Sequence, residues 1–430
     1  MPSVPTIEII TERPLFVAGQ EQIADLLIRI LPPEVDIRRR RAPFNLSLVM
    51  DRSGSMGGEK IRRAREAVCY CVDQLLPDDR VSVIIFDQVV KLCVPCQQVT
   101  DKQAIRERVR GVEAGGSTAL HEAWVRGGIE VSQHLNPEAI NRVILVTDGL
   151  ANVGETRSDR IISQAGELAA RGVSTTTIGI GDDFKEDLLI PMAEAGRGNA
   201  WHVREAAEME RIFATELEGL TAQVGHTVSL GFSPADGVRV SDVLNDFEVT
   251  HTGRYKLPNL ILGQPIEVVV RLSLPAGRVG ERKHLLDLRL AWNPQMSDGE
   301  KTPVEKVTGR REAVTQPVMI EFDAAAAVEQ LPVDARLTKA VQMLLSARAR
   351  REAIGFMDVG DYRRARHLVF CASAALRDAG SKMDDDDMLK DSSELAQMAR
   401  VIEEGPQAAA GTRKRMLYQR HSLRRTGKSS

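Results

Sequence analysis

From Phe44 onward, short apolar runs alternate with stretches of helical periodicity, and this alternation restricts the fold more than any other feature of the chain. Between the first two runs, apolar residues recur every three or four positions, which predicts an amphipathic helix over 59–76. Such alternation is typical of a doubly wound, mostly parallel α/β sheet with helices on both faces. The predicted strands are 44–50, 80–86, 142–147, 173–180 and 199–203, with an antiparallel edge strand at 89–99 and further helices at 101–111, 119–134, 157–171, 184–195 and 205–220.

Oxygen-bearing side chains that could bind a cation occur at three places in this region, two of them directly after a predicted strand. Asp51, Ser53 and Ser55 alternate in a glycine-containing loop directly after the first strand. Thr118 lies in a later Gly-Gly-Ser-Thr segment, and Asp148 follows the apolar run that ends at 147. In a doubly wound sheet, loops at the carboxyl ends of the strands converge where the strand order reverses. The sequence therefore predicts one all-oxygen site, which suits a hard divalent cation.

This pattern of Asp-x-Ser-x-Ser, a distant Thr and a distant Asp-Gly resembles the metal-ion-dependent adhesion site of von Willebrand factor type A domains, in their bacterial cytoplasmic form. The resemblance spans about 42–220 and extends to the segment 177–182 with Gly196 and Gly198. A lone Asp-x-Ser-x-Ser would be a weak signal, whereas five positions in the correct order are a specific one. The alternative is that the hydroxyls only cap helices and form turns, as Ser and Thr commonly do.

The resemblance implies a role for each of the five residues. Ser53 and Ser55 would ligate a magnesium ion directly, Thr118 would ligate it in the partner-bound form, and Asp51 and Asp148 would hold its waters. Mn²⁺ and Ca²⁺ are the alternative ions. One coordination position would stay open for an Asp or Glu of a partner protein, and capture of that carboxylate would be coupled to a shift of the Thr118 loop and of the last helix.

The rest of the chain divides into further segments. At 430 residues it is too long for one core. After Ala222 the apolar pattern changes from a helical period to a period of two, which predicts an antiparallel β-sandwich, and from Pro332 it becomes helical again. We expect N-terminal strands at 1–41 that join the sandwich, an inserted type A domain at 42–221, the sandwich at 222–322, a helical hairpin or bundle at 332–405, and a disordered basic tail at 406–430.

Composition limits the classes of partner and the compartment. The formal net charge of -3 provides no global field for nucleic acid, which leaves only the basic tail as a candidate contact. No stretch approaches the roughly 18 apolar residues of a membrane span, and the N-terminus lacks a leader pattern, so a cytoplasmic location is expected. Cys93 and Cys96 could form half of a zinc or redox site, but small apolar residues on an edge strand are the simpler interpretation.

Two other functions are compatible with parts of the pattern. A phosphatase or phosphotransferase of the haloacid-dehalogenase kind would also place Asp51 after the first strand, but it needs a second acid where Ser53 stands. A cell-surface adhesin or channel-associated subunit would share the metal site but requires export and anchoring segments. We therefore predict a non-enzymatic, magnesium-dependent adaptor in a bacterial cytoplasmic complex, with an AAA+ ATPase of the MoxR type or a signalling operon as its expected context.

Overall fold

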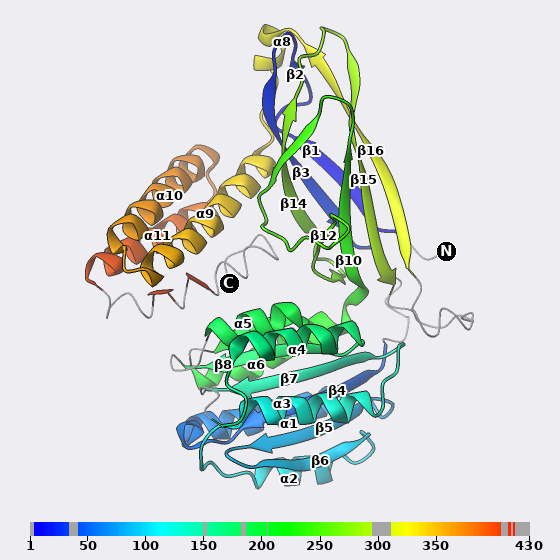
Figure 1. The fold of residues 1–430 in the computed structure, drawn as a ribbon, viewed down its shortest axis with the longest axis vertical. Coiled ribbons are helices and arrows are strands. Elements are labelled where there is room, and N and C mark those ends of the chain that lie inside the picture. The colour runs from blue at the N-terminus through cyan, green and yellow to red at the C-terminus, as the bar shows by residue number, and fades with distance from the viewer. Residues whose placement is uncertain are drawn as a thin grey trace. The chain divides into compact units, whose positions relative to one another are not determined.

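The computed structural model describes residues 4–33, 42–148, 153–181, 186–203, 205–294, 311–405, 412–413 and 416–417 (Figure 1). The chain forms two compact units. One contains the described residues from 42 to 222, and the other contains the N-terminal segment, the described residues 223–294 and the C-terminal part from 311. This division has the predicted form, in which an α/β domain is inserted into a β-sandwich that is followed by helices.

The α/β unit is built on one six-stranded sheet with the order β6-β5-β4-β7-β8-β9. All neighbouring pairs are parallel except β5 and β6, which are antiparallel, as predicted for the edge strand. The strand order reverses between β4 and β7, and both strands are buried along their whole length. The strands are β4 (Phe44–Asp51), β5 (Arg80–Phe86), β6 (Val90–Gln98), β7 (Ile140–Thr147), β8 (Ser174–Ile180) and β9 (Arg197–Val203).

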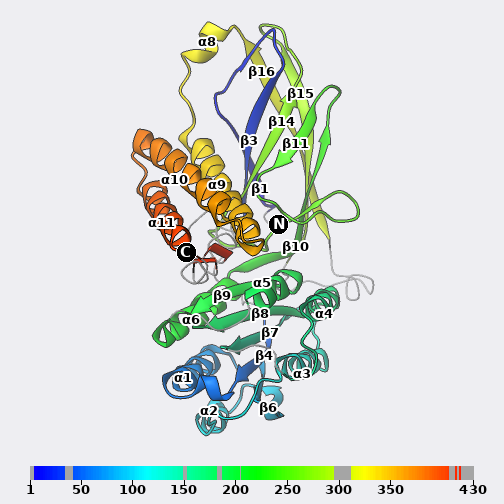
Figure 2. The ribbon, with the colours of Figure 1, turned by 60° about the vertical axis from the view of Figure 1, so that its left-hand side comes forward.

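Helices cover both faces of this sheet, with α1, α2 and α6 on one side and α3, α4 and α5 on the other (Figure 2). The apolar side chains of α1 that the sequence placed on one stripe, such as Ile61, Val68 and Val72, are buried against the sheet. The helices are α1 (Glu59–Gln74), α2 (Lys102–Arg110), α3 (Leu120–Ser132), α4 (Ser158–Ala170), α5 (Glu186–Ala195) and α6 (Met209–Thr221), with 3-10 turns η1 (Gly54–Met56) and η2 (Ala206–Glu208).

A buried polar cluster joins α6 to the sheet. Glu216 of α6 is fully buried, and its carboxylate accepts hydrogen bonds from Arg142 of β7 at 2.6 Å and Thr176 of β8 at 2.7 Å. Asn199 and Trp201 of β9 donate to its other oxygen at 2.6 and 2.8 Å. The last helix of the unit is thus tied to three strands by one side chain.

The second unit contains the predicted sandwich. Its first sheet has the order β1-β3-β14-β11, so the N-terminal hairpin of β1 and β3 joins, through β3, a strand some 240 positions later in the chain, and the α/β unit is an insertion. The second sheet has the order β12-β10-β15-β16-β2, with β13 also paired to β10. The strands are β1 (Thr6–Thr11), β2 (Phe16–Val17), β3 (Gln22–Leu31), β10 (Gln223–Pro234), β11 (Arg239–Val243), β12 (Tyr255–Lys256), β13 (Leu260–Ile261), β14 (Ile266–Leu274), β15 (Arg282–Pro294) and β16 (Glu312–Asp323).

The C-terminal helices pack on this sandwich and on one another. Leu337 and Leu344 of α9 join a small apolar cluster with Leu27 and Val269 of the first sheet. Inside the bundle, Arg350 of α9 and Asp391 of α11 form a fully buried ion pair. The helices are α8 (Ala325–Glu329), α9 (Ala335–Asp358), α10 (Tyr362–Met383) and α11 (Asp386–Glu403).

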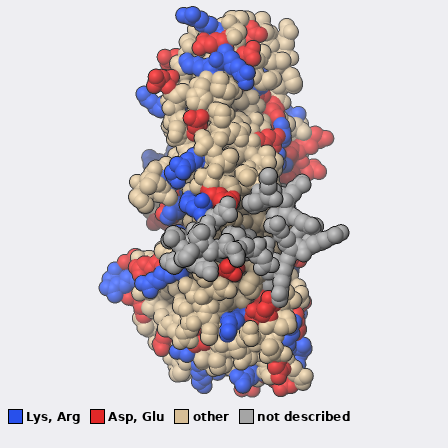
Figure 3. Space-filling view, turned by 90° about the vertical axis from the view of Figure 1, so that its right-hand side faces the viewer, with Lys and Arg blue, Asp and Glu red and all other residues tan. Residues whose placement is uncertain are grey.

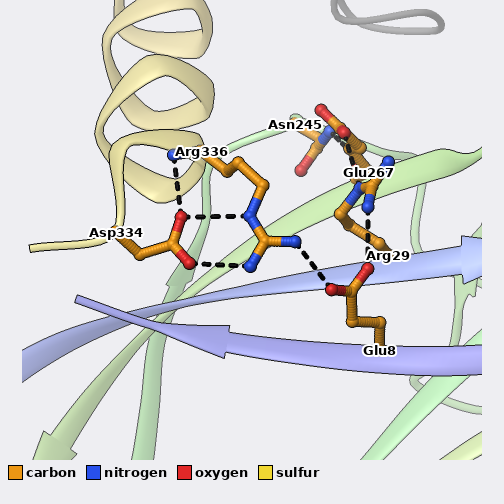
Figure 4. A network of polar contacts seen from close by, with 6 residues as sticks. All are labelled: Glu8, Arg29, Asn245, Glu267, Asp334 and Arg336. Carbon is orange, nitrogen blue, oxygen red and sulfur yellow. Dashed lines mark hydrogen bonds and ion pairs between the residues drawn. The ribbon is translucent and has the colours of Figure 1, made fainter. Parts of the chain in front are cut away.

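Charged side chains fix the start of α9 on the sandwich (Figure 4). Asp334 caps the helix by accepting from the backbone N–H of Arg336 at 2.9 Å, and its carboxylate also binds the Arg336 guanidinium. That guanidinium reaches Glu8 of β1 at 2.7 Å, and Glu8 in turn accepts from Arg29 of β3 at 2.7 Å. Arg29 also pairs with Glu267 of β14, so the network crosses three strands.

The surface of the described residues carries charges of both signs, and a charged contact is made near the C-terminus. On the face drawn in Figure 3, the described basic and acidic side chains are interspersed. No helix in the described ranges combines the length and hydrophobicity needed to cross a membrane. Most of the predicted disordered tail at 406–430 lies outside the described residues, but Arg413, which is described, donates to Asp358 at the end of α9 at 2.7 Å.

Candidate metal centre

Asp51 is the last residue of β4, and its carboxylate is completely enclosed. One oxygen accepts from the backbone N–H of Ser53 at 2.7 Å, and the other accepts from the hydroxyl of Thr147, the last residue of β7, at 2.5 Å. A side-chain hydrogen bond therefore joins the last residues of the two central strands, β4 and β7. This arrangement follows from parallel pairing of β4 with β7, which brings their carboxyl ends to one edge of the sheet.

Ser53, Ser55 and Asp148 form a hydrogen-bonded chain at that edge. The hydroxyl oxygens of Ser53 and Ser55 are 3.1 Å apart, and the Ser55 hydroxyl lies 2.7 Å from Oδ1 of Asp148, to which it donates. When a hydroxyl donates its hydrogen to a carboxylate, its lone pairs remain available for a cation. Neighbouring ligands at ~2.0 to 2.1 Å in an octahedron would be about 2.9 Å apart, so the serine spacing fits magnesium coordination.

The local structure argues against a role for these hydroxyls as helix caps. Ser53 is the N-cap residue of η1 but makes no side-chain capping bond, and α1 begins after Gly58 rather than after a serine. Helix α3 has Ala119 as its N-cap, so Thr118 does not cap it either. The hydroxyls of Ser53 and Ser55 are directed to one another and to Asp148 instead.

Thr118 is brought to the same edge by backbone contacts between loops. The N–H of Gly115 donates to the carbonyl of Arg52 at 2.7 Å, and the N–H of Gly54 donates to the carbonyl of Gly116 at 2.9 Å. Thr118 itself is buried, and no side-chain hydrogen bond joins it to the other four candidate residues, all of which the structure describes. The five predicted residues thus lie on three neighbouring loops, with four of them linked by hydrogen bonds.

Sequence reasoning did not identify the residues that hold the Thr118 loop in place. Asp87, just beyond β5, forms an ion pair with Arg52 at 2.5 Å and accepts from the N–H of Ala119 through its backbone carbonyl at 2.8 Å. The side chain of Gln88 accepts from the N–H of Ser117 at 2.8 Å. The only available sequence signal was that Asp87 follows a predicted strand, as Asp51 and Asp148 do.

Gly116 provides a test of this loop. Its φ of +85° favours glycine, and a Cβ there would be 2.0 Å from Oε1 of Gln88 and 2.9 Å from Cβ of Asp87. We expect Gly116→Ala to weaken Mn²⁺ binding by roughly tenfold, because the loop that carries Thr118 must move to relieve this clash and a left-handed strain of ~1–2 kcal/mol. Calorimetric Mn²⁺ titration measures this effect. Gly253→Ala has similar strain, at φ +73° with nothing within 4 Å, and should leave the Mn²⁺ affinity unchanged.

The charges in the site are few and mostly enclosed. Burial raises the pKa of Asp51 to about 6, against the lowering effect of hydrogen bonds from Thr147 and Ser53, and the negative charge of Asp148 adds to the rise. Lys60 of α1 forms an ion pair with Asp148 at 2.5 Å. No group of three His, Cys, Asp or Glu side chains suited to a metal occurs among the described residues, so a cation here would depend on hydroxyls and waters for most of its ligands.

Cys93 and Cys96 lie on the edge strand β6 and are not bonded to each other. Cys93 packs against the core beneath α1 and α2, whereas the thiol of Cys96 lies 3.7 Å from the side-chain oxygen of Asn45. Burial raises the pKa of the Cys96 thiol to about 11, which disfavours the thiolate that zinc binding or redox exchange requires. The geometry favours a packing role.

Comparison with known proteins places the α/β unit in a family. The model of the von Willebrand factor type A domain matches residues 45–215. An uncharacterised protein of Synechocystis is 31% identical over 180 residues, which is 42% of each chain, and mouse inter-alpha-trypsin inhibitor heavy chain H2 is 29% identical over 172 residues. The matched region is 37% of this chain and 18% of the mouse protein, so this chain spans less than half the length of either relative.

Two solved structures share the fold over both units. A von Willebrand factor type A protein from Catenulispora acidiphila superposes with a TM-score of 0.64 at 17% identity, covering 93% of this chain and 90% of that one. The ArnB paralog VWA2 from Sulfolobus acidocaldarius gives a TM-score of 0.57 at 16% identity, covering 98% of each chain. The inserted unit of this chain is therefore a von Willebrand factor type A domain.

Proposed function

We propose that this domain binds a divalent cation, Mg²⁺ with Mn²⁺ or Ca²⁺ as alternatives, and uses it to capture an acidic side chain of a partner protein. The observation that supports this most strongly is the chain from Ser53 through Ser55 to Asp148, whose oxygen spacing suits an octahedral ion. Ser53 and Ser55 would bind the ion directly. Asp51 and Asp148 would act through waters, and Thr118 would join when the partner is bound.

The chain's own residues prepare the site for such a ligand. Asp51 and Asp148 are held by internal hydrogen bonds and an ion pair, so their positions are fixed before a cation arrives. Two carboxylates would only neutralise the ion, which would supply a Lewis-acidic position for an outside carboxylate. The Arg52–Asp87 pair and Gln88 hold the loop that carries Thr118 against this position.

Domains of this family typically mediate interactions between proteins. We infer that the chain is an adaptor in a cytoplasmic complex rather than an enzyme, and that an AAA+ ATPase of the MoxR type is a candidate partner. The phosphatase alternative gains no support from the site, because Ser53 occupies the place of the required second acid and donates its backbone N–H to Asp51.

Affinity capture from a bacterial lysate tests the proposal. Wild-type protein with Mg²⁺ is compared with wild type in EDTA and with Asp51→Ala in Mg²⁺. Proteins that are retained only by the first sample identify the metal-dependent partner, and adding excess acetate should release them. A partner set that is identical in all three samples would contradict the proposed function, as would magnesium- and Asp51-dependent hydrolysis of a generic phosphoester by the purified protein.

A further inference from the structure

The two carboxylates of the site differ in the charge of their hydrogen-bond donors. Asp51 accepts from neutral donors, the backbone N–H of Ser53 and the Thr147 hydroxyl. Asp148 instead accepts from the Ser55 hydroxyl on one oxygen and from the ammonium of Lys60 on the other, at 2.7 and 2.5 Å. The Asp148 carboxylate thus binds both the ammonium of Lys60 and the hydroxyl of Ser55. A hard cation bound at the two serines would therefore have the positive charge of Lys60 close by.

The position of Lys60 is restricted by its surroundings. Lys60 lies in the first turn of α1, directly after the loop that carries the two serines, and its side chain is 29% exposed. The end of β8 approaches it, since a Cβ at Gly181 would lie 3.6 Å from the ammonium nitrogen. Gly181 has a φ of +72°, so this approach is made by a residue without a side chain. The ammonium is therefore held at the rim while remaining accessible to solvent.

We propose that Lys60 determines ligand preference at this site by shifting its charge balance from cation binding toward carboxylate binding. The inference rests on the proposed function and names a residue that the candidate ligand set does not include. A divalent ion with Asp51 and Asp148 alone would be neutral overall, whereas Lys60 adds one positive charge at the rim. This charge opposes entry of a cation and attracts an incoming carboxylate, which would have both the ion and the ammonium beside it.

The effects of removing Lys60 on the two ligands should therefore have opposite signs. A single charge close to a site at the protein surface changes affinity by about tenfold, since the interaction is partly screened by solvent. In Lys60→Met, we expect Mn²⁺ to bind roughly tenfold more tightly and acetate to bind the Mn²⁺-loaded protein roughly tenfold more weakly. A purely structural role for Lys60, in which it only orients Asp148, would instead weaken Mn²⁺ binding when it is removed.

Full-length wild type, Lys60→Met, Lys60→Gln and Lys60→Arg are compared by Mn²⁺ titration with electron paramagnetic resonance and by acetate titration of the Mn²⁺-loaded proteins. Lys60→Arg keeps the charge and should behave like wild type in both titrations. Arg62→Met is the matched control, because Arg62 is another α1 cation that pairs with Glu59 and Glu66 away from the site. Circular dichroism verifies that each variant is folded, and Lys60→Gln replaces Lys60→Met if the latter is not.

The outcomes separate this inference from the proposed function. If wild type binds Mn²⁺ and acetate but Lys60→Met or Lys60→Gln loses Mn²⁺ affinity, or keeps wild-type acetate affinity, the role of Lys60 is wrong and the metal site stands. If wild type binds no Mn²⁺ at all, both the proposed function and the inference fail. Opposite changes in the two affinities, absent in Lys60→Arg and Arg62→Met, would establish Lys60 as the residue that sets the preference.

Discussion

Replacing Asp51 with asparagine is expected to abolish divalent-cation binding while leaving the metal-free domain as stable as wild type or more so. Asparagine is nearly isosteric with aspartate. Its side-chain oxygen can still accept from the N–H of Ser53, and its amide can donate to the hydroxyl of Thr147, so the bonds that close the ends of β4 and β7 are kept. Only the negative charge is removed.

The expected stability follows from the cost of that buried charge. The pKa of Asp51 is raised from 3.8 to about 6, so the folded protein favours the protonated acid. A carboxyl group with a raised pKa weakens the fold as the pH rises above its unfolded value, and the difference corresponds to at most ~3 kcal/mol at neutral pH. An uncharged side chain avoids this cost. The same charge is what would neutralise a divalent ion, so the variant should lose the ion.

Differential scanning calorimetry with and without Mn²⁺ distinguishes the two effects. Wild type should melt at a higher temperature when Mn²⁺ is added, because an ion that binds only the folded state stabilises it. Asp51→Asn should show no Mn²⁺ response and an unchanged or raised melting temperature without metal. Asp73→Asn, on the same unit but away from the site, should keep the Mn²⁺ response. A variant that retains the wild-type response would show that Asp51 is not part of the site.

The arrangement of the α/β unit could be predicted because its signals are local in sequence. Every residue of β4 and β7 is buried, and both strands are mostly apolar in sequence, while the stripe on α1 has the period of a helix. The five candidate ligands were recognisable because each follows a predicted strand or belongs to a specific pattern. Their neighbourhood in space followed from the rule for parallel sheets.

Interactions between distant segments could not be predicted in the same way. The Arg52–Asp87 pair and the contact of Lys60 with Asp148 depend on exact loop geometry, which composition and periodicity do not contain. Likewise, the apolar face of α9 was evident, but its packing against Leu27 of β3 was not, because an apolar stripe does not identify its partner.

Glu216 is an intermediate case. The sequence shows that this acid lies on an apolar helix face, but it does not show which residues bind it. It lies on the apolar face of α6 among buried residues such as Ile212, Phe213 and Leu217. An acid at such a position needs a partner, because an unpaired buried charge is very costly. In the structure this partner is Arg142, and the buried ion pair leads to a prediction with a large expected effect.

Glu216→Gln is expected to destabilise the α/β unit by ~3–5 kcal/mol at neutral pH, the usual cost of breaking a buried ion pair. The substituted amide cannot accept on both sides, so Arg142 is left as a buried charge without its counter-ion. Chemical denaturation followed by fluorescence measures the loss, and hydrogen exchange in α6, β8 and β9 assigns it to this unit. Glu218→Gln, at an exposed position on the same helix, should have almost no effect.

Lowering the pH should reduce the difference in the free energy of unfolding between Glu216→Gln and wild type. Burial alone would raise the pKa of Glu216, but Arg142 and the donors Asn199, Thr176 and Trp201 outweigh it, so the pKa lies below 4.5. A carboxylate with a lowered pKa adds stability that is fully present above its unfolded pKa and is lost as the pH falls through its folded pKa. The two proteins should therefore converge in stability below about pH 4.5. A difference that stays constant with pH would show that the charge is not the cause.

The double variant Arg142→Met/Glu216→Met separates stability from conformational specificity. Replacing both members of a buried pair with apolar residues is often neutral or stabilising, whereas removing one member is not. Most of the loss in Glu216→Gln should therefore be recovered, unless the remaining donors Thr176, Asn199 and Trp201 are left unsatisfied. Because these three donors belong to β8 and β9, incomplete recovery would show that the carboxylate also fixes α6 against those strands.

A helix fixed in this way would resist the shift of α6 that partner capture was predicted to cause. A double variant that binds acetate more tightly than wild type would therefore indicate that the buried network restrains that movement.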